Sequence, residues 1–177
     1  SISSTISGEM KKDAIVAIAV SSVLMLLYIA FRFSDVKFGI SAVLALVHDV
    51  LVVFAAYSIG TLSVGNTFIA CMLTIVGYSI NATIIIFDRI RENMRTQDSK
   101  ESLEALVNKS IGQTFTRTIY TSLTTFIMVF VLFVMGVTSL KEFTFTLMLG
   151  IVCGAYSSVC ITGPLWYTMK KHTKKKA

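Results

Sequence analysis

Five long apolar runs restrict the fold of this chain more than any other feature of the sequence. They cover residues 14–31, 38–59, 67–87, 119–137 and 143–167. Each is long enough to cross a hydrocarbon core of about 30 Å as a helix. The runs lack the alternation of polar and apolar residues that β-strands show. Inside a bilayer the alternative to a closed β-barrel is the α-helix, which pairs all its backbone groups internally. The sequence therefore predicts an all-α integral membrane protein, built as a bundle of five transmembrane helices.

Composition excludes the class of soluble enzymes. Hydrophobic residues make up 54% of the 177 residues and charged residues only 15%, whereas a soluble domain carries about 25% charged residues. The three cysteines, Cys71, Cys153 and Cys160, all fall inside apolar runs, where a thiol packs as a small hydrophobe. Their spacing matches no metal site or disulfide framework, so we expect no cofactor and no metal.

The distribution of basic residues predicts the orientation in the membrane. Lys11, Lys12 and Lys141 fall on one side of the five spans, and the other thirteen Lys and Arg residues on the opposite side. By the positive-inside rule the N-terminus is extracytoplasmic and the C-terminus cytoplasmic. The net charge of +6 then indicates contact with the lipid bilayer, with no nucleic acid as partner. An external N-terminus without a signal peptide predicts a further helix upstream in a longer protein.

The same reading divides the chain into three parts. Residues 1–13 form an extracytoplasmic juxtamembrane segment, residues 14–167 a transmembrane domain, and residues 168–177 a basic cytoplasmic tail. The longest connection, residues 88–118, lies on the cytoplasmic side and contains a short predicted helix that Asp98 and Ser99 can cap. Its apolar face predicts that this helix lies along the membrane surface; the face consists of Leu103, Leu106, Val107 and Ile111.

Asp49 is the only formally charged residue inside the five runs, and it lies near the middle of the second. A carboxylate at this depth costs about 3 kcal/mol, so such a residue usually faces the bundle interior and often serves an ion pathway. The alternative is a hydrogen-bonded Asp49 that only joins helices. His48, its neighbour, is a second ion-relay candidate, although a packed interior role is the commoner one for such a residue. Adjacent helical residues point about 100 degrees apart, which disfavours an intramembrane enzyme, and we expect no catalytic residue.

Small and polar residues form stripes on the other runs. They predict faces where a second helix approaches closely, and Asn81 adds an amide that needs a partner in hydrocarbon. Arg117, at the start of the fourth run, can extend to the cytoplasmic surface or turn inward toward a buried carboxylate. The stripes are Ala70, Thr74, Gly77 and Asn81 in the third run, Thr114, Thr118, Thr121, Ser122 and Thr125 in the fourth, and Gly150, Gly154 and Ser158 in the fifth.

One stretch is specific enough to indicate a family. Gly77-Tyr78-Ser79-Ile80-Asn81, followed by Asp88-Arg89-Ile90-Arg91-Glu92-Asn93, resembles the signature of SecF proteins, in which Gly77, Tyr78, Asn81, Asp88 and Arg89 are the signature residues here. Val47-His48-Asp49-Val50 before it, and Arg117-Thr118 with Thr121-Ser122-Leu123-Thr124-Thr125 after it, match in order and spacing. The resemblance extends over residues 36–166.

This resemblance to the SecD/SecF family of the RND superfamily implies a function. SecF-like proteins have six transmembrane helices with an extracytoplasmic domain after the first, and this chain looks like helices two to six. They lie in the bacterial inner membrane, pair with SecD, and use the ion gradient to help move a translocating polypeptide through the SecYEG translocon. The ion-relay candidates are then Asp49, Asn81, Arg117 and His48, along a polar path between the second, third and fourth runs, and SecD is expected to pack on the Gly150, Gly154 and Ser158 face.

The sequence departs from the family pattern at one position. SecF proteins commonly have Asp after the Asn of the third-run motif, where this chain has Ala82. Two other functions therefore stay open: an uncoupled structural scaffold of the translocase, or a fragment of a small-molecule RND transporter. The loops at about residues 60–66 and 138–142 are short for the drug-binding domains that the transporter needs.

Overall fold

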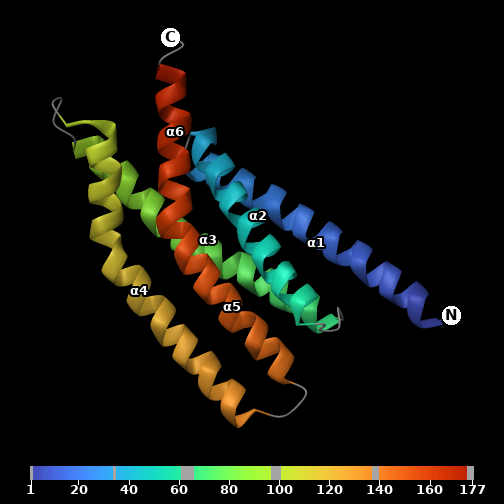
Figure 1. Cartoon of the computed structure of the whole chain (residues 1–177). Helices are drawn as coiled ribbons and strands as arrows, with labels where there is room; N and C mark the ends of the chain where they lie inside the picture. Colours follow the sequence, from blue (N-terminus) through green and yellow to red (C-terminus); the bar gives the residue numbers. More distant parts are fainter. Residues whose placement is uncertain (1, 34, 61–65, 97–100, 137–139, 175–177) are drawn as a thin grey trace.

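The computed structural model describes residues 2–33, 35–60, 66–96, 101–136 and 140–174, and it leaves out some side chains in the first range and those of residues 66, 67, 173 and 174. Within these ranges the secondary structure is helical. The helices are α1 (Ile2–Phe33), α2 (Val36–Ile59), α3 (Asn66–Thr96), α4 (Leu103–Met135), α5 (Lys141–Ser157), the π-helical turn η2 (Ser158–Thr162) and α6 (Gly163–Lys174). Figure 1 shows them as long neighbouring rods, with α5 and α6 between α2 and α4.

Among the described residues, four helical stretches are long and apolar enough to cross a membrane. They are Val36–Ile59, Phe68–Thr96, Leu103–Met135 and Lys141–His172. The predicted span 14–31 lies within α1, so the count of five stays a prediction. In α4 only 11% of the apolar window is buried, against 50% in the third helix. One side of the bundle therefore leaves α4 available to lipid or to another protein.

The connection predicted for residues 88–118 is shorter in the structure, and this boundary is corrected. Helix α3 continues to Thr96, and α4 begins at Leu103 and runs unbroken through the predicted interfacial segment. The hydroxyl of Ser102 caps α4 by accepting from the Ala105 N–H at 3.2 Å; Asp98 and Ser99 lie outside the described residues. Leu106 and Val107 are buried against the bundle. An apolar face can pack on other helices or on lipid, and here it packs on helices.

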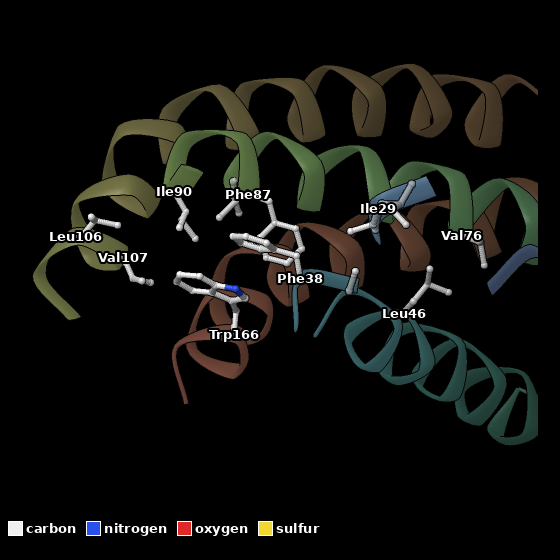
Figure 2. Packing of buried hydrophobic residues seen from close by; sticks show 12 residues of the cluster. Ile29, Phe38, Leu46, Val76, Phe87, Ile90, Leu106, Val107 and Trp166 are labelled. Atoms are coloured by element: carbon white, nitrogen blue, oxygen red, sulfur yellow. The ribbon is translucent and has the colours of Figure 1, made fainter. Parts of the chain in front are cut away.

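The largest core cluster lies where α2, α3, α4 and α6 meet. The Trp166 ring, fully buried, stacks on Phe38 with centroids 4.6 Å apart, and Phe38 meets Phe87 edge-on at the same distance. Figure 2 shows these rings beside Ile90 and Leu106. The aromatic contacts fix α6 against the start of α2 and the end of α3.

A polar contact fixes the same end of the bundle. Asp35 caps α2 by accepting from the Lys37 N–H at 3.1 Å, and its second carboxylate oxygen lies 2.9 Å from Lys170 Nζ. Partial burial acts to raise the pKa of Asp35, but the Lys170 and Lys37 interactions outweigh it and hold that pKa below its ordinary value of 3.8. Asp35 is therefore charged at neutral pH and holds α6 to α2.

The last span is not a regular α-helix. Pro164 lacks an N–H, and its ring conflicts with the carbonyl group four residues earlier in an α-helix. The chain widens just before it into the π-helical turn η2, and Figure 1 shows a change of direction between α5 and α6. A proline and a π-turn are both recognised causes of such bends.

Candidate functional site

Asp49 lies at the centre of a buried polar cluster formed by three helices. Its side chain on α2 is 1% exposed. Its Oδ2 atom accepts hydrogen bonds from Ser79 on α3 at 2.6 Å and from Ser157 on α5 at 2.7 Å, and both serines are buried. Because a buried carboxylate is costly without donors, the two hydroxyls make this position tolerable and tie the three helices together.

His48 completes the cluster from the same helix as Asp49. Its Nδ1 atom lies 3.2 Å from Asp49 Oδ1, and its side chain is 38% exposed. Adjacent helical residues point about 100 degrees apart, and rotation about the side-chain bonds brings these two side chains into contact. His48 thus lies between the surface of the bundle and the buried carboxylate, and the imidazole also lies near the Tyr156 ring, with centroids 6.4 Å apart.

Ser157 and Ser79 are the residues of this cluster that sequence reasoning did not select as site residues. The four-residue spacing in the fifth run selected Ser158 instead, whose hydroxyl bonds only to the Ala155 carbonyl of its own helix at 3.0 Å. The signal that could have found Ser157 is the Ser-Ser pair itself, since residues three and four positions after Gly154 lie on the same helix face. Helical phase alone did not choose between them, because Ser157 and Ser158 follow Gly154 by three and four residues and both fit the stripe.

Helices α3 and α5 approach each other closely beside the cluster. A Cβ atom placed on Gly154 would lie 3.2 Å from Ser79 Cβ, and one on Gly150 would overlap the Ile75 side chain. The expected SecD contact on this glycine face is therefore corrected, because α3 of the same chain already occupies it. Gly77 shows the opposite behaviour, since a Cβ there would meet nothing within 4 Å.

The predicted polar path between the second, third and fourth spans is also corrected. Asp49 receives its donors from α3 and α5, whereas the hydroxyl band of α4 faces another side of α3. There Tyr78 donates to Ser122 at 3.1 Å, and a small chamber is lined by Tyr78, Asn81, Ala82, Ile85, Thr118, Thr121 and Ser122. The Thr118 hydroxyl is buried without a hydrogen-bond partner.

A polar cavity of about 450 Å³ adjoins this chamber and shares Ile85 with it. Its lining residues are Ile85, Asp88, Arg89, Glu92, Gln113, Thr114 and Arg117. Arg89 donates to Gln113 at 2.7 Å and pairs with Glu92 at 2.6 Å. Arg117 is exposed and lines this cavity, so of the two orientations considered the outward one is observed. The candidates therefore divide into two groups, His48 and Asp49 on one side of α3, and Asn81 with Arg117 on the other.

Comparisons with known proteins identify the family. The profile described as "Protein export membrane protein SecD/SecF, C-terminal" matches residues 1–172. The chain belongs to the SecD/SecF family. It is 41% identical to the protein translocase subunit SecF of Alicyclobacillus acidocaldarius over 100% of this chain and 58% of that protein. It is 40% identical to the protein translocase subunit SecDF of Bacillus subtilis, over 99% of this chain and 24% of the relative.

A solved SecDF structure matches this SecD/SecF domain in three dimensions. The crystal structure of SecDF from Thermus thermophilus superposes with a TM-score of 0.86 at 42% identity, over 91% of this chain and 22% of that one. The resemblance inferred from the signature residues is thereby confirmed, as is the all-helical membrane fold, and the chain is a multi-pass membrane protein. It spans a little over half the length of the SecF relatives it matches.

Proposed function

We propose that this chain is the ion-coupled membrane part of an accessory subunit of the Sec protein translocase. Its relatives are named protein translocase subunits SecF and SecDF, and the observation that carries the coupled role is the buried Asp49 carboxylate with donors from two other helices. A cation that reaches Asp49 neutralises it, and neutralisation changes how strongly the carboxylate holds Ser79 and Ser157. The ion gradient then acts on helix packing.

The energy available is sufficient for such a role. Moving one elementary charge across 100 mV releases about 2.3 kcal/mol, and hydrogen bonds to a charged group contribute ~1.5–3 kcal/mol. The two quantities are similar, so one ion can change the balance between two arrangements of α2, α3 and α5. In this proposal His48, at the outer side of the cluster, is the first group that the ion meets.

The exposed face of α3 suggests where the partner subunit binds. Ala70, Thr74, Gly77 and Asn81, predicted to form one stripe, are all exposed along α3. An exposed Asn amide is unfavourable in hydrocarbon unless another helix pairs with it, and small residues permit close approach. We therefore place SecD on this face, with SecYEG and the translocating polypeptide as further partners of the assembled protein in the bacterial inner membrane.

The test is export by vesicles that carry the full-length protein in its complex. Asp49→Asn keeps the shape and hydrogen-bonding capacity of the side chain and removes its charge, so stimulation by the membrane potential should fall to the level without a potential. Glu142→Gln is the matched control, because Glu142 is exposed at the start of α5. Full stimulation in Asp49→Asn would favour the scaffold, the alternative in which the protein only holds the translocase together.

A further inference from the structure

An apolar groove with a volume of about 460 Å³ lies between α4 and the last span. Figure 1 shows α4 and α5 running side by side. The groove is lined from α4 by Phe115, Ile119 and Phe126, and from the last span by Val152, Tyr156 and Cys160. Both walls belong to helical stretches that are long and apolar enough to cross a membrane. The groove therefore lies at the depth of the lipid chains.

The groove is too narrow to take up another helix. Its α4 wall extends from Phe115 to Phe126, which is about 16 Å at a rise of about 1.5 Å per residue. A volume of about 460 Å³ over this length gives a mean cross-section of about 30 Å². A helix with its side chains is about 10–12 Å in diameter, which is a cross-section of roughly 80–110 Å². A groove of this shape accommodates one extended hydrocarbon chain.

A polar pocket of about 170 Å³ lies further along the same seam, between α4 and α6, and its lining includes Glu104, Asn108 and Tyr167. The Tyr167 hydroxyl donates to the Glu104 carboxylate at 3.1 Å, and Lys171 Nζ lies 5.5 Å from the centre of the Tyr167 ring. Glu104 and Lys171 are both exposed. The pocket thus presents a carboxylate and an ammonium group around one tyrosine, a residue that is enriched where membrane helices meet the lipid headgroups.

The distance between the pocket and the groove matches a lipid molecule. Tyr167 follows Cys160 by seven residues, which is about 10 Å along the span. One leaflet contributes about 15 Å of hydrocarbon, half of a core of about 30 Å. A chain that starts beside Tyr167 therefore extends about ten residues back along the span, to the level of Ser157. The end of this chain then lies inside the groove, between Cys160 and Val152.

We propose that this seam binds a phospholipid with an amine headgroup, phosphatidylethanolamine, with one acyl chain in the groove and the headgroup at the pocket. The headgroup ammonium lies against the Glu104 carboxylate, and the phosphate lies against Lys171. Phosphatidylglycerol carries the same phosphate without the ammonium, so it leaves Glu104 beside a negative charge. An exposed ion pair changes an affinity by about two- to fivefold, and the site should prefer phosphatidylethanolamine by that factor. This site does not depend on the role proposed for Asp49.

The test is photo-crosslinking in vesicles that carry the full-length protein in its complex. The vesicles consist of phosphatidylglycerol with a trace of one probe, phosphatidylethanolamine or phosphatidylglycerol, whose acyl chain ends in a diazirine. Mass spectrometry of the peptides that contain residues 115–126 and 151–160 measures the labelling. The phosphatidylethanolamine probe should label these peptides about two to five times more strongly than the phosphatidylglycerol probe.

Matched variants separate the headgroup contact from the groove. Glu104→Gln keeps the shape of the side chain and removes its charge, so the preference between the probes should disappear. Glu92→Gln is the control and should keep the preference, because Glu92 is an exposed carboxylate on α3 that pairs with Arg89. Val152→Phe adds bulk inside the groove, so labelling by both probes should fall. Val134→Phe, on an exposed part of α4 outside the groove, should leave the labelling unchanged.

Three results would overturn the proposed lipid site. Equal labelling by the two probes would show only ordinary contact of lipid with the surface of the bundle. No labelling by either probe would show that another protein segment covers the seam. A preference that persists in Glu104→Gln would show that the pocket does not bind the headgroup. If Val152→Phe does not fold, the comparison of Glu104→Gln with Glu92→Gln decides alone.

Discussion

The hydroxyl of Ser157 donates to the Oδ2 atom of Asp49 at 2.7 Å, across 108 positions of the chain. The same oxygen accepts from Ser79 at 2.6 Å. One buried carboxylate oxygen therefore joins α2, α3 and α5. A substitution at either serine should therefore weaken the packing of all three helices.

Removing one donor should destabilise the bundle. Ser157→Ala leaves the buried Asp49 carboxylate with one hydroxyl donor. Loss of a hydrogen-bond partner by a buried polar group costs about 1–3 kcal/mol of stability. We expect a lower thermal unfolding midpoint in detergent for Ser157→Ala and for Ser79→Ala. Ser158→Ala should remain near the wild-type midpoint, and equal losses in Ser157→Ala and Ser158→Ala would contradict the role given to Asp49.

Larger side chains at Gly154 and at Gly77 should have different effects on the stability of the bundle. Gly154→Leu places a bulky side chain where Ser79 leaves no room, so the bundle should lose at least ~1–3 kcal/mol of stability, the usual cost of overpacking. Gly77→Ala adds a methyl group in open space and should not destabilise the isolated chain. Thermal unfolding of purified variants measures both effects. A stable Gly154→Leu variant would show that α3 and α5 do not pack as described.

The contact between Asp35 and Lys170 predicts a dependence of stability on acid. Since the folded-state pKa of Asp35 is lowered from 3.8, its contribution to stability is present above that value and is lost as the pH falls through the folded-state pKa. Lys170→Ala should therefore be less stable than wild type at neutral pH, and the difference should shrink in acid. Lys171→Ala, which removes a lysine that lies over Tyr167 instead, is the control. A difference that does not change with pH would contradict the assignment.

The chamber between α3 and α4 predicts the effect of restoring an acid at position 82. Ala82 is buried beside Asn81 and near the unpartnered Thr118 hydroxyl, which can donate to a new carboxylate. Ala82→Asp should therefore fold and increase export driven by a proton gradient. The comparison is Ala82→Asn, which has the same shape and no charge. Equal export by the two variants would show that a missing acid does not limit coupling.

The orientation can be tested by labelling from outside intact cells. In a protein whose native cysteines are replaced by Ala, a membrane-impermeant maleimide should modify Gly60→Cys at the end of α2. It should not modify Thr96→Cys at the end of α3, because the excess of Lys and Arg predicts that this side is cytoplasmic. The reverse pattern would overturn the orientation and the side from which an ion reaches His48.

The sequence by itself determined that the chain forms membrane helices, and it identified Asp49 as the residue that needs an explanation. Both conclusions follow from the free energy of placing a residue in hydrocarbon. A long apolar run is stable there, and a carboxylate is costly there, whatever the tertiary fold. The signature Gly77 to Asn93 was likewise readable without a structure, because a family pattern is a property of the sequence.

Only the tertiary structure decided which residues meet. Gly77 and Gly154 both lie on stripes of small residues, yet one faces open space and the other faces Ser79, since a stripe shows that approach is possible and not which helix approaches. Ser157 and Ser158 follow Gly154 by three and four residues, so both fit one helical stripe, and only the packing of α5 against α2 shows that Ser157 reaches Asp49. Periodicity gives the faces of one helix, whereas contacts between helices decide which residue of a face meets a partner.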